Sequence, residues 1–160
     1  MSLGVFFKGC LFMRIVITNE QDCIPIVEEK IYKAIRMLPG SDKKYRLSVV
    51  YLNDAEIAKL NERDLHHKGP TDVLAYPLES NEGEVYISAE TALHEATERH
   101  IEPEGELILY TIHGTLHLLG YDDLDDEGFK EMHGIEKRII EELGYTWNWN
   151  METENKHDLD

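Results

Sequence analysis

The chain has 160 residues, the length of one ordinary domain, because a second hydrophobic core would need more chain. Hydrophobic residues make up 42% of it and charged residues 30%, which excludes wholesale disorder. The net charge of −16 argues against a general nucleic-acid-binding surface, because Lys and Arg supply most nonspecific affinity for phosphates. Residues 1–70 nevertheless carry 11 Lys and Arg against 9 Asp and Glu, whereas residues 71–160 carry 5 against 23. A polyanion is therefore expected to approach the amino-terminal half, although an acidic surface without a specific partner is the simpler interpretation of charge alone.

The ends of the chain and its cysteines narrow the class of protein. Two cysteines, Cys10 and Cys23, predict neither a disulfide framework nor a cysteine zinc site, and no apolar run is long enough to cross a bilayer. Residues 4–12 lack a signal-peptide cleavage site, which predicts a cytoplasmic protein in which residues 1–12 are an N-terminal extension or a cloning scar. Residues 148–160 are polar and predict a disordered tail. A single domain is expected over residues 13–147.

The first half of this domain predicts two strands and two helices. Residues 13–17 predict a strand, and a helix is expected to open at Pro25 and to run to Leu38, before Pro39-Gly40. Residues 47–51 alternate as a strand does, and Asn53 with Glu56 resembles a capping box at the start of a helix through residue 61.

The second half predicts two short strands followed by helices. The strands are expected over residues 73–76, ended by Pro77, and over residues 84–87. Ser88 is expected to cap a helix to about residue 99, and Pro103 to open a buried helix with an apolar stretch over residues 107–119. A last helix is predicted over about residues 125–143. Strands first and helices later predict an α+β fold of mixed α/β layers.

The segment of residues 113–123 carries the clearest chemistry. His113 and His117 are four residues apart, so both imidazoles can turn toward one ion on a helix. Gly120 can end that helix in the left-handed conformation, so that Asp123 returns toward the pair. Zinc accepts imidazole nitrogen and carboxylate oxygen, and three protein ligands leave the fourth position for water. Two histidines with this spacing are more often polar groups of the core than metal ligands. The carboxylate of Asp123 as a third ligand, with Gly120 to reverse the chain, favours a metal site instead.

The same spacing occurs in the metzincin proteases, in which a Glu follows the first His and acts as the general base. Here that position is Gly114, which has no side chain. A metzincin-like protease is therefore a weak alternative. The neighbouring acids are interpreted as the acidic first turn of the last helix rather than as ligands; they are Asp122, Asp125, Asp126 and Glu127.

The segment H-G-T-L-H-L-L-G-Y-D-D resembles the pattern H-G-x-L-H-L-x-G-Y-D-H of the YbeY family of metal-dependent endoribonucleases, and ten of eleven positions agree. Residues 70–77, P-T-D-V-L-A-Y-P, and residues 83–88, G-E-V-Y-I-S, are similar to two further motifs of this family. The resemblance covers about residues 45–143. It implies a small mixed β-sheet packed with helices and a metal site on the buried helix. It also implies a role in ribosomal RNA maturation and ribosome quality control.

Two departures from the family pattern bear on the site. The third family histidine falls at Asp123, so the predicted ligands are His113, His117 and Asp123, with zinc as the expected divalent metal and manganese, iron or nickel harder to exclude. The arginine of the family's basic segment falls at Leu65. His66 and Lys68 are the substrate-binding candidates that remain, and a solvated loop explains them equally well.

The leading hypothesis is a metal-dependent endoribonuclease that acts on ribosomal RNA, with the ribosome or its assembly factors as partners, and with no membrane and no organic cofactor. The pattern identifies no general base. Lys30, Lys33 and Arg36, with the basic residues 43, 44 and 46, are expected to form a face for RNA, or else the solvated side of a helix and its turn. A noncatalytic ribosome-associated binding factor with a structural metal is the main alternative.

Overall fold

The structure is a computed structural model and describes residues 13–148. The predicted extension or cloning scar of residues 1–12, and residues 149–160 of the predicted tail, lie outside the described residues. Asn148, the first residue of that tail, donates a hydrogen bond from Nδ2 to the carbonyl of Arg99 at 2.9 Å. Within residues 13–148, no helix combines the length and the apolar character needed to span a membrane.

One four-stranded mixed sheet forms the centre of the fold. The strands are β1 (Arg14–Asn19), β2 (Arg46–Leu52), β3 (Val73–Glu79) and β4 (Glu82–Ser88), in the spatial order β1-β2-β4-β3. The pairs β1–β2 and β2–β4 are parallel, and β3–β4 is antiparallel. The predicted small mixed sheet is therefore confirmed.

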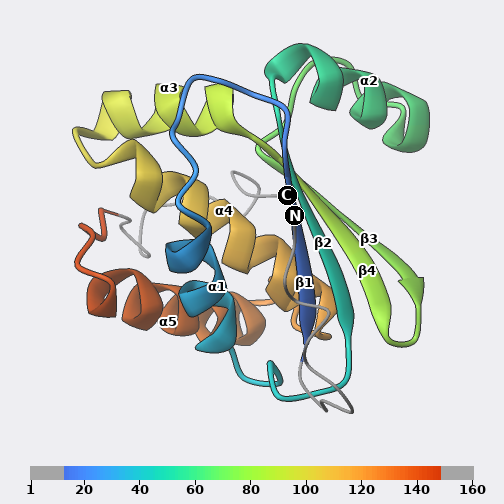
Figure 1. Cartoon of the computed structure of the whole chain (residues 1–160), viewed down its shortest axis with the longest axis vertical. Coiled ribbons are helices and arrows are strands. Elements are labelled where there is room, and N and C mark those ends of the chain that lie inside the picture. Colours follow the sequence, from blue (N-terminus) through green and yellow to red (C-terminus); the bar gives the residue numbers. More distant parts are fainter. Residues whose placement is uncertain (1–12, 149–160) are drawn as a thin grey trace.

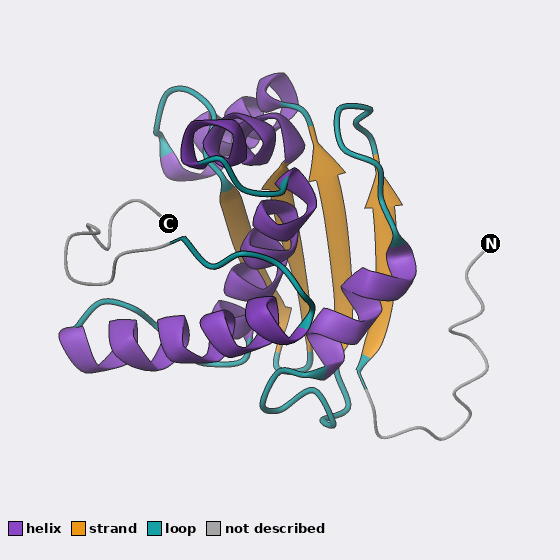
Figure 2. Ribbon diagram, turned by 90° about the vertical axis from the view of Figure 1, so that its left-hand side faces the viewer, coloured by secondary structure: helices purple, strands orange, loops and turns teal. Residues whose placement is uncertain are grey.

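Five helices cover the two faces of this sheet unequally. They are α1 (Glu28–Arg36), α2 (Asp54–Leu65), α3 (Ala89–Arg99), α4 (Pro103–Leu118) and α5 (Asp126–Glu142). Helices α1, α3, α4 and α5 lie on one face, and α2 lies on the other (Figures 1 and 2). The α+β prediction is confirmed, with α4 as the buried helix next to the sheet.

Three predicted boundaries were wrong. Helix α1 begins at Glu28 rather than at Pro25, because the Gln21 side chain binds the backbone N–H groups of Cys23 and Ile24 and holds the preceding loop. Strand β3 continues past Pro77 to Glu79, which an edge strand tolerates because a proline there removes no essential ladder bond. Helix α2 runs on to Leu65, and its N-cap Asn53 makes no side-chain capping bond.

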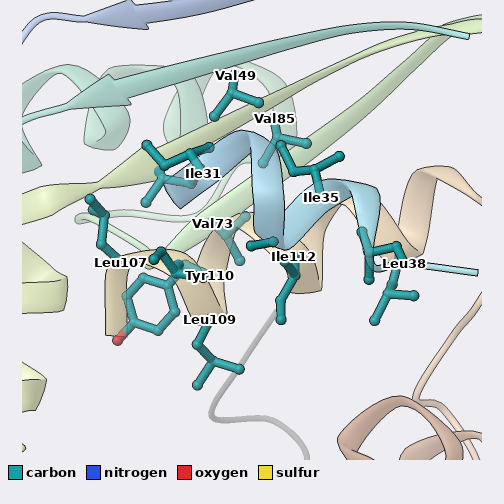
Figure 3. Close-up of a cluster of buried hydrophobic side chains, with 14 of the residues drawn as sticks. Ile31, Ile35, Leu38, Val49, Val73, Val85, Leu107, Leu109, Tyr110 and Ile112 are labelled. Carbon is teal, nitrogen blue, oxygen red and sulfur yellow. The ribbon is translucent and has the colours of Figure 1, made fainter. Parts of the chain in front are cut away.

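The main core lies between the sheet and the four helices on that face. Ile31 and Ile35 of α1 lie beside Val49 and Val85 of the sheet, and Ile112 of α4 belongs to the same buried cluster (Figure 3). Helix α4 comes close to the sheet at Gly114, where a Cβ atom would lie 2.6 Å from Val85 Cγ1. Helix α4 therefore lies directly on the sheet at Gly114. This contact sets the rotation of the helix about its axis, and so determines which side chains face away from the strands.

Candidate metal centre

Helix α4 presents two imidazoles close together at its carboxyl end. The Nε2 atoms of His113 and His117 lie 3.2 Å apart. The side chain of His113 is fully buried, whereas that of His117 is 27% exposed. The pair therefore lies at the edge of the core, with His113 inside the protein and His117 in contact with solvent.

A tight reversal after α4 brings a carboxylate back to this pair. Gly120 has φ +103°, and its N–H donates to the carbonyl of His117 at 3.1 Å, while Tyr121 N–H donates to the carbonyl of Leu116 at 3.0 Å. Three residues beyond this glycine, Asp123 lies 3.7 Å from His117 Nε2 and 3.8 Å from His113 Nε2. The structure thus brings the three predicted ligand residues together, with one donor atom from each within 4.8 Å of the others.

The outer nitrogens of both imidazoles are engaged by acceptors. His117 Nδ1 lies 3.1 Å from the carbonyl oxygen of Tyr121, which only accepts, so this nitrogen carries the proton. His113 Nδ1 lies 2.7 Å from Glu136 Oε2. Both Nε2 atoms are then left to face Asp123 and one another, as metal-bound imidazoles do.

The electrostatics of the pair also favour one cation between the rings. Burial opposes protonation of His113, but the charge and hydrogen bond of Glu136, together with the charges of Asp72 and Asp123, raise the His113 pKa. Burial and the neighbouring His113 charge lower the pKa of His117. With both Nδ1 atoms engaged by acceptors, the two Nε2 atoms at 3.2 Å can share a proton or bind a cation, and two nitrogens with one carboxylate oxygen are a donor set that suits zinc. The residues present therefore fit a divalent metal ion.

Helix α5 supplies an outer layer that the sequence analysis missed. Glu136 is fully buried, and its Oε1 lies 3.0 Å from Nδ1 of His133, a side chain that is 3% exposed. The ring of His133 lies edge-on to Phe129, with 4.2 Å between the centroids. The signal in the sequence was a His and a Glu three residues apart on one face of the last helix.

Asp72 is a further buried acid beside the centre. Burial raises its pKa to about 6, while the positive charge of His113 acts in the opposite direction. Its carboxylate accepts hydrogen bonds from the backbone N–H of Val73 at 2.8 Å and from the hydroxyl of Thr71 at 3.1 Å. These bonds fix the start of β3, and Val73 packs next to Gly114.

The two substrate-binding candidates lie in the loop between α2 and β3. His66 ends α2 in the left-handed conformation, with φ 58°, and both His66 and Lys68 are exposed. Leu65, at the position of the family's arginine, is 47% exposed. Their role in binding substrate stays a prediction.

The acids that follow the centre cap backbone groups rather than join the ligands. Asp122 is exposed and accepts a hydrogen bond from Leu124 N–H at 3.2 Å. Asp125 accepts one from Gly128 N–H at 2.7 Å and is the N-cap of α5. The prediction of an acidic helix start is confirmed for Asp125, Asp126 and Glu127, whereas Asp122 lies in the loop before α5.

The position of Gly114 also weakens the protease alternative. A side chain there would meet Val85 and Val73, so the position faces the sheet. A glutamate at this point would enter the core instead of approaching a metal-bound water. The helix thus has no place for the general base that the metzincin mechanism needs.

Comparison with known proteins decides the family. The family model described as endoribonuclease YbeY matches residues 16–144, almost the whole described region. This chain belongs to the YbeY family. An endoribonuclease YbeY from Chloroherpeton thalassium is 39% identical over 121 residues, which cover 72% of this chain and 86% of the relative. One from Clostridioides difficile is 30% identical over 151 residues, which cover 84% of this chain and 99% of the relative.

A solved structure matches the fold as well. The solution structure of a Thermotoga maritima protein matches with a TM-score of 0.64 at 32% identity, covering 81% of this chain and 88% of that one. The predicted family and fold are therefore both confirmed.

Proposed function

We propose that this protein is a metal-dependent endoribonuclease that hydrolyses RNA phosphodiesters at the centre of His113, His117 and Asp123. The observation that carries the proposal is the convergence of three donors, in a YbeY family chain, on a point that opens to solvent beside His117. Three protein ligands leave a coordination position for substrate or water, whereas a structural zinc site usually closes with four. This count disfavours a noncatalytic ribosome-associated factor with a structural metal.

The ligand set defines the chemistry. A divalent ion, with zinc as the first choice, would polarise a phosphoryl oxygen and lower the pKa of a bound water toward neutrality. His113 and His117 would hold it through Nε2, since their Nδ1 atoms are engaged by Glu136 and by the Tyr121 carbonyl. Asp123 would contribute a carboxylate oxygen, since its side chain lies 3.8 Å from His113 Nε2 and 3.7 Å from His117 Nε2.

RNA is proposed to approach over the amino-terminal half. A pocket of about 480 Å³ lies between the loop after α1 and the turn after α4, and Lys43 and Tyr121 are among its lining residues. Lys33 and Arg36 are exposed on α1, next to this loop. Lys30 is less available for phosphate, because its Nζ pairs with Glu104 at 2.9 Å. Ribosomal RNA, in the cytoplasm and on the ribosome or its assembly intermediates, is the proposed substrate.

Cleavage of structured and single-stranded ribosomal RNA tests the proposal, with wild type and His117→Ala purified in parallel. Wild type is expected to lose cleavage after treatment with a chelator and to regain it with zinc or manganese. His117→Ala is expected to stay inactive under both conditions. Equal cleavage by the two preparations would identify a contaminating nuclease, and no cleavage by either would reject the proposed activity.

A further inference from the structure

We propose that Glu136 is a positioning residue of the metal centre, which fixes the tautomer of His113 and supplies the second negative charge that balances a divalent ion. The inference rests on the metal centre of the proposed function. It assigns to α5 a role in metal binding beyond its packing against α4.

The contact between Glu136 and His113 is short and is excluded from solvent. The two side chains are fully buried, and 2.7 Å separates Glu136 Oε2 from His113 Nδ1. A metal ion bound to Nε2 of His113 would take the lone pair of that nitrogen, so Nδ1 would carry the proton of the ring and donate it to Oε2 of Glu136. A charge-assisted bond of this kind also makes the imidazole a stronger metal ligand.

A second imidazole lies beside the other oxygen of this carboxylate. His133 Nδ1 lies 3.0 Å from Glu136 Oε1, one turn earlier on the same helix, although the two atoms do not form a hydrogen bond. The ring of His133 has aromatic neighbours, with centroids 4.2 Å away at Phe129 and 6.0 Å away at Trp147. The hydrogen bond to His113 is therefore the contact that orients Glu136 toward the metal centre.

Charge provides the second argument. An ionised carboxylate without solvent is costly unless positive charge lies near it. With a metal ion on their Nε2 atoms both imidazoles would be neutral, and the carboxylates of Asp123 and Glu136 lie close enough to balance the charge of a divalent ion. The groups that bind the two Nδ1 atoms differ in charge, because the partner of His117 is the uncharged carbonyl of Tyr121. The stronger charge-assisted bond is therefore at His113, the more buried ligand.

Zinc affinity of wild type and Glu136→Gln tests the inference, measured by competition with a chromophoric chelator. The variant keeps the shape of the side chain but removes its charge. We expect its zinc affinity to fall by roughly 10- to 100-fold, as for other outer-shell partners. Glu106→Gln is the matched control, because Glu106 is also buried, at 1% exposed, but lies at the other end of α4, so its zinc affinity is expected to equal that of wild type.

A second measurement needs no variant. Nitrogen-15 NMR of wild type with and without zinc reports which imidazole nitrogen of His113 carries the proton, and Nδ1 is expected in both states. Protonation at Nε2 in the metal-free protein with Nδ1 unprotonated, or equal zinc affinity of Glu136→Gln and wild type, would overturn the inference alone. Failure of wild type itself to bind zinc or another divalent ion would reject the metal centre and the inference together.

Discussion

Two buried glutamates show how the surroundings of one residue type set its charge. Glu136 faces two imidazoles, and the charge of His113 lowers its pKa in spite of burial. Glu106 lies 3.1 Å from Arg99, yet burial dominates and raises its pKa to about 7. The Oε1 atom of each glutamate makes no hydrogen bond within the described part of the chain. The two carboxyl groups therefore differ mainly in their charged neighbours, which outweigh burial at Glu136 but not at Glu106.

The raised pKa of Glu106 predicts a pH-dependent effect of Glu106→Gln on stability. The unfolded carboxyl loses its proton near pH 4.5, whereas the folded one keeps it until about pH 7, so wild type loses stability as the pH rises through this window. Near pH 4 the variant is expected to match wild type, and near pH 8 to exceed it by up to about 3 kcal/mol. Urea unfolding at a series of pH values measures this difference. A difference that stays constant with pH would contradict the assignment.

Asp123 predicts a sharper effect on metal binding. Asp123→Ala removes one of three donors, so its loss of zinc affinity should exceed the roughly 10- to 100-fold typical of an outer-shell partner. Asp122→Ala is the neighbouring control, because its carboxylate is exposed and caps the backbone at Leu124. Titration calorimetry with zinc compares the two variants. Equal affinities would remove Asp123 from the ligand set.

At the scale of the elements, the fit of α4 against the sheet depends on a missing side chain. A Cβ at Gly114 would lie 2.6 Å from Val85 Cγ1 and 2.9 Å from Val73 Cγ2, and both valines are rigid core residues. Helix α4 would have to move away from the sheet to accept it, and His113 would move with it.

Gly114→Ala is therefore expected to destabilise the fold by about 1–3 kcal/mol, the range for overpacked cores. Gly134→Ala on α5 is the matched change, because a Cβ there meets nothing within 4 Å. That variant should gain about 0.5–1 kcal/mol from helix propensity. Urea denaturation measures the free energy of unfolding of each variant, which should fall for Gly114→Ala and rise for Gly134→Ala. Equal effects would show that α4 can move away from the sheet without cost.

The elements also show what the sequence could predict. Hydrophobic periodicity located all nine helices and strands of residues 13–148, and the His-x-x-x-His spacing with Gly120 predicted how three ligands would meet. The start of α1 was wrong because Gln21, three residues before Ile24, forms loop bonds that no propensity describes. The role of Glu136 was missed because its partner His113 is 23 residues away, and only the packing of α5 on α4 brings them together.

At the scale of the whole molecule, basic residues from the first half of the chain lie near the turn after His117, where Asp42 and Glu131 line the same pocket. Lys33 and Arg36 lie on α1, and Lys43 lies in the loop that lines the pocket beside the turn after His117. The acidic half of the chain supplies α4 and α5. Acidic side chains there would repel the phosphates of RNA that approaches the proposed metal centre from that side. Approach from the α1 side reconciles a net charge of −16 with a polyanionic substrate.

Reversal of the positive charges on α1 tests this direction of approach. Lys33→Glu with Arg36→Glu should weaken RNA binding and lower the salt dependence of the binding constant by about one unit of slope for each phosphate that the protein no longer neutralises. Lys137→Glu with Arg138→Glu on α5 changes the net charge equally, and both residues are exposed. Filter binding over a range of salt concentrations compares the pairs. If local phosphate contacts hold the RNA, only the α1 pair changes the slope; an equal decrease in affinity for both pairs would mean that net charge alone governs the encounter and that α1 is not the RNA face.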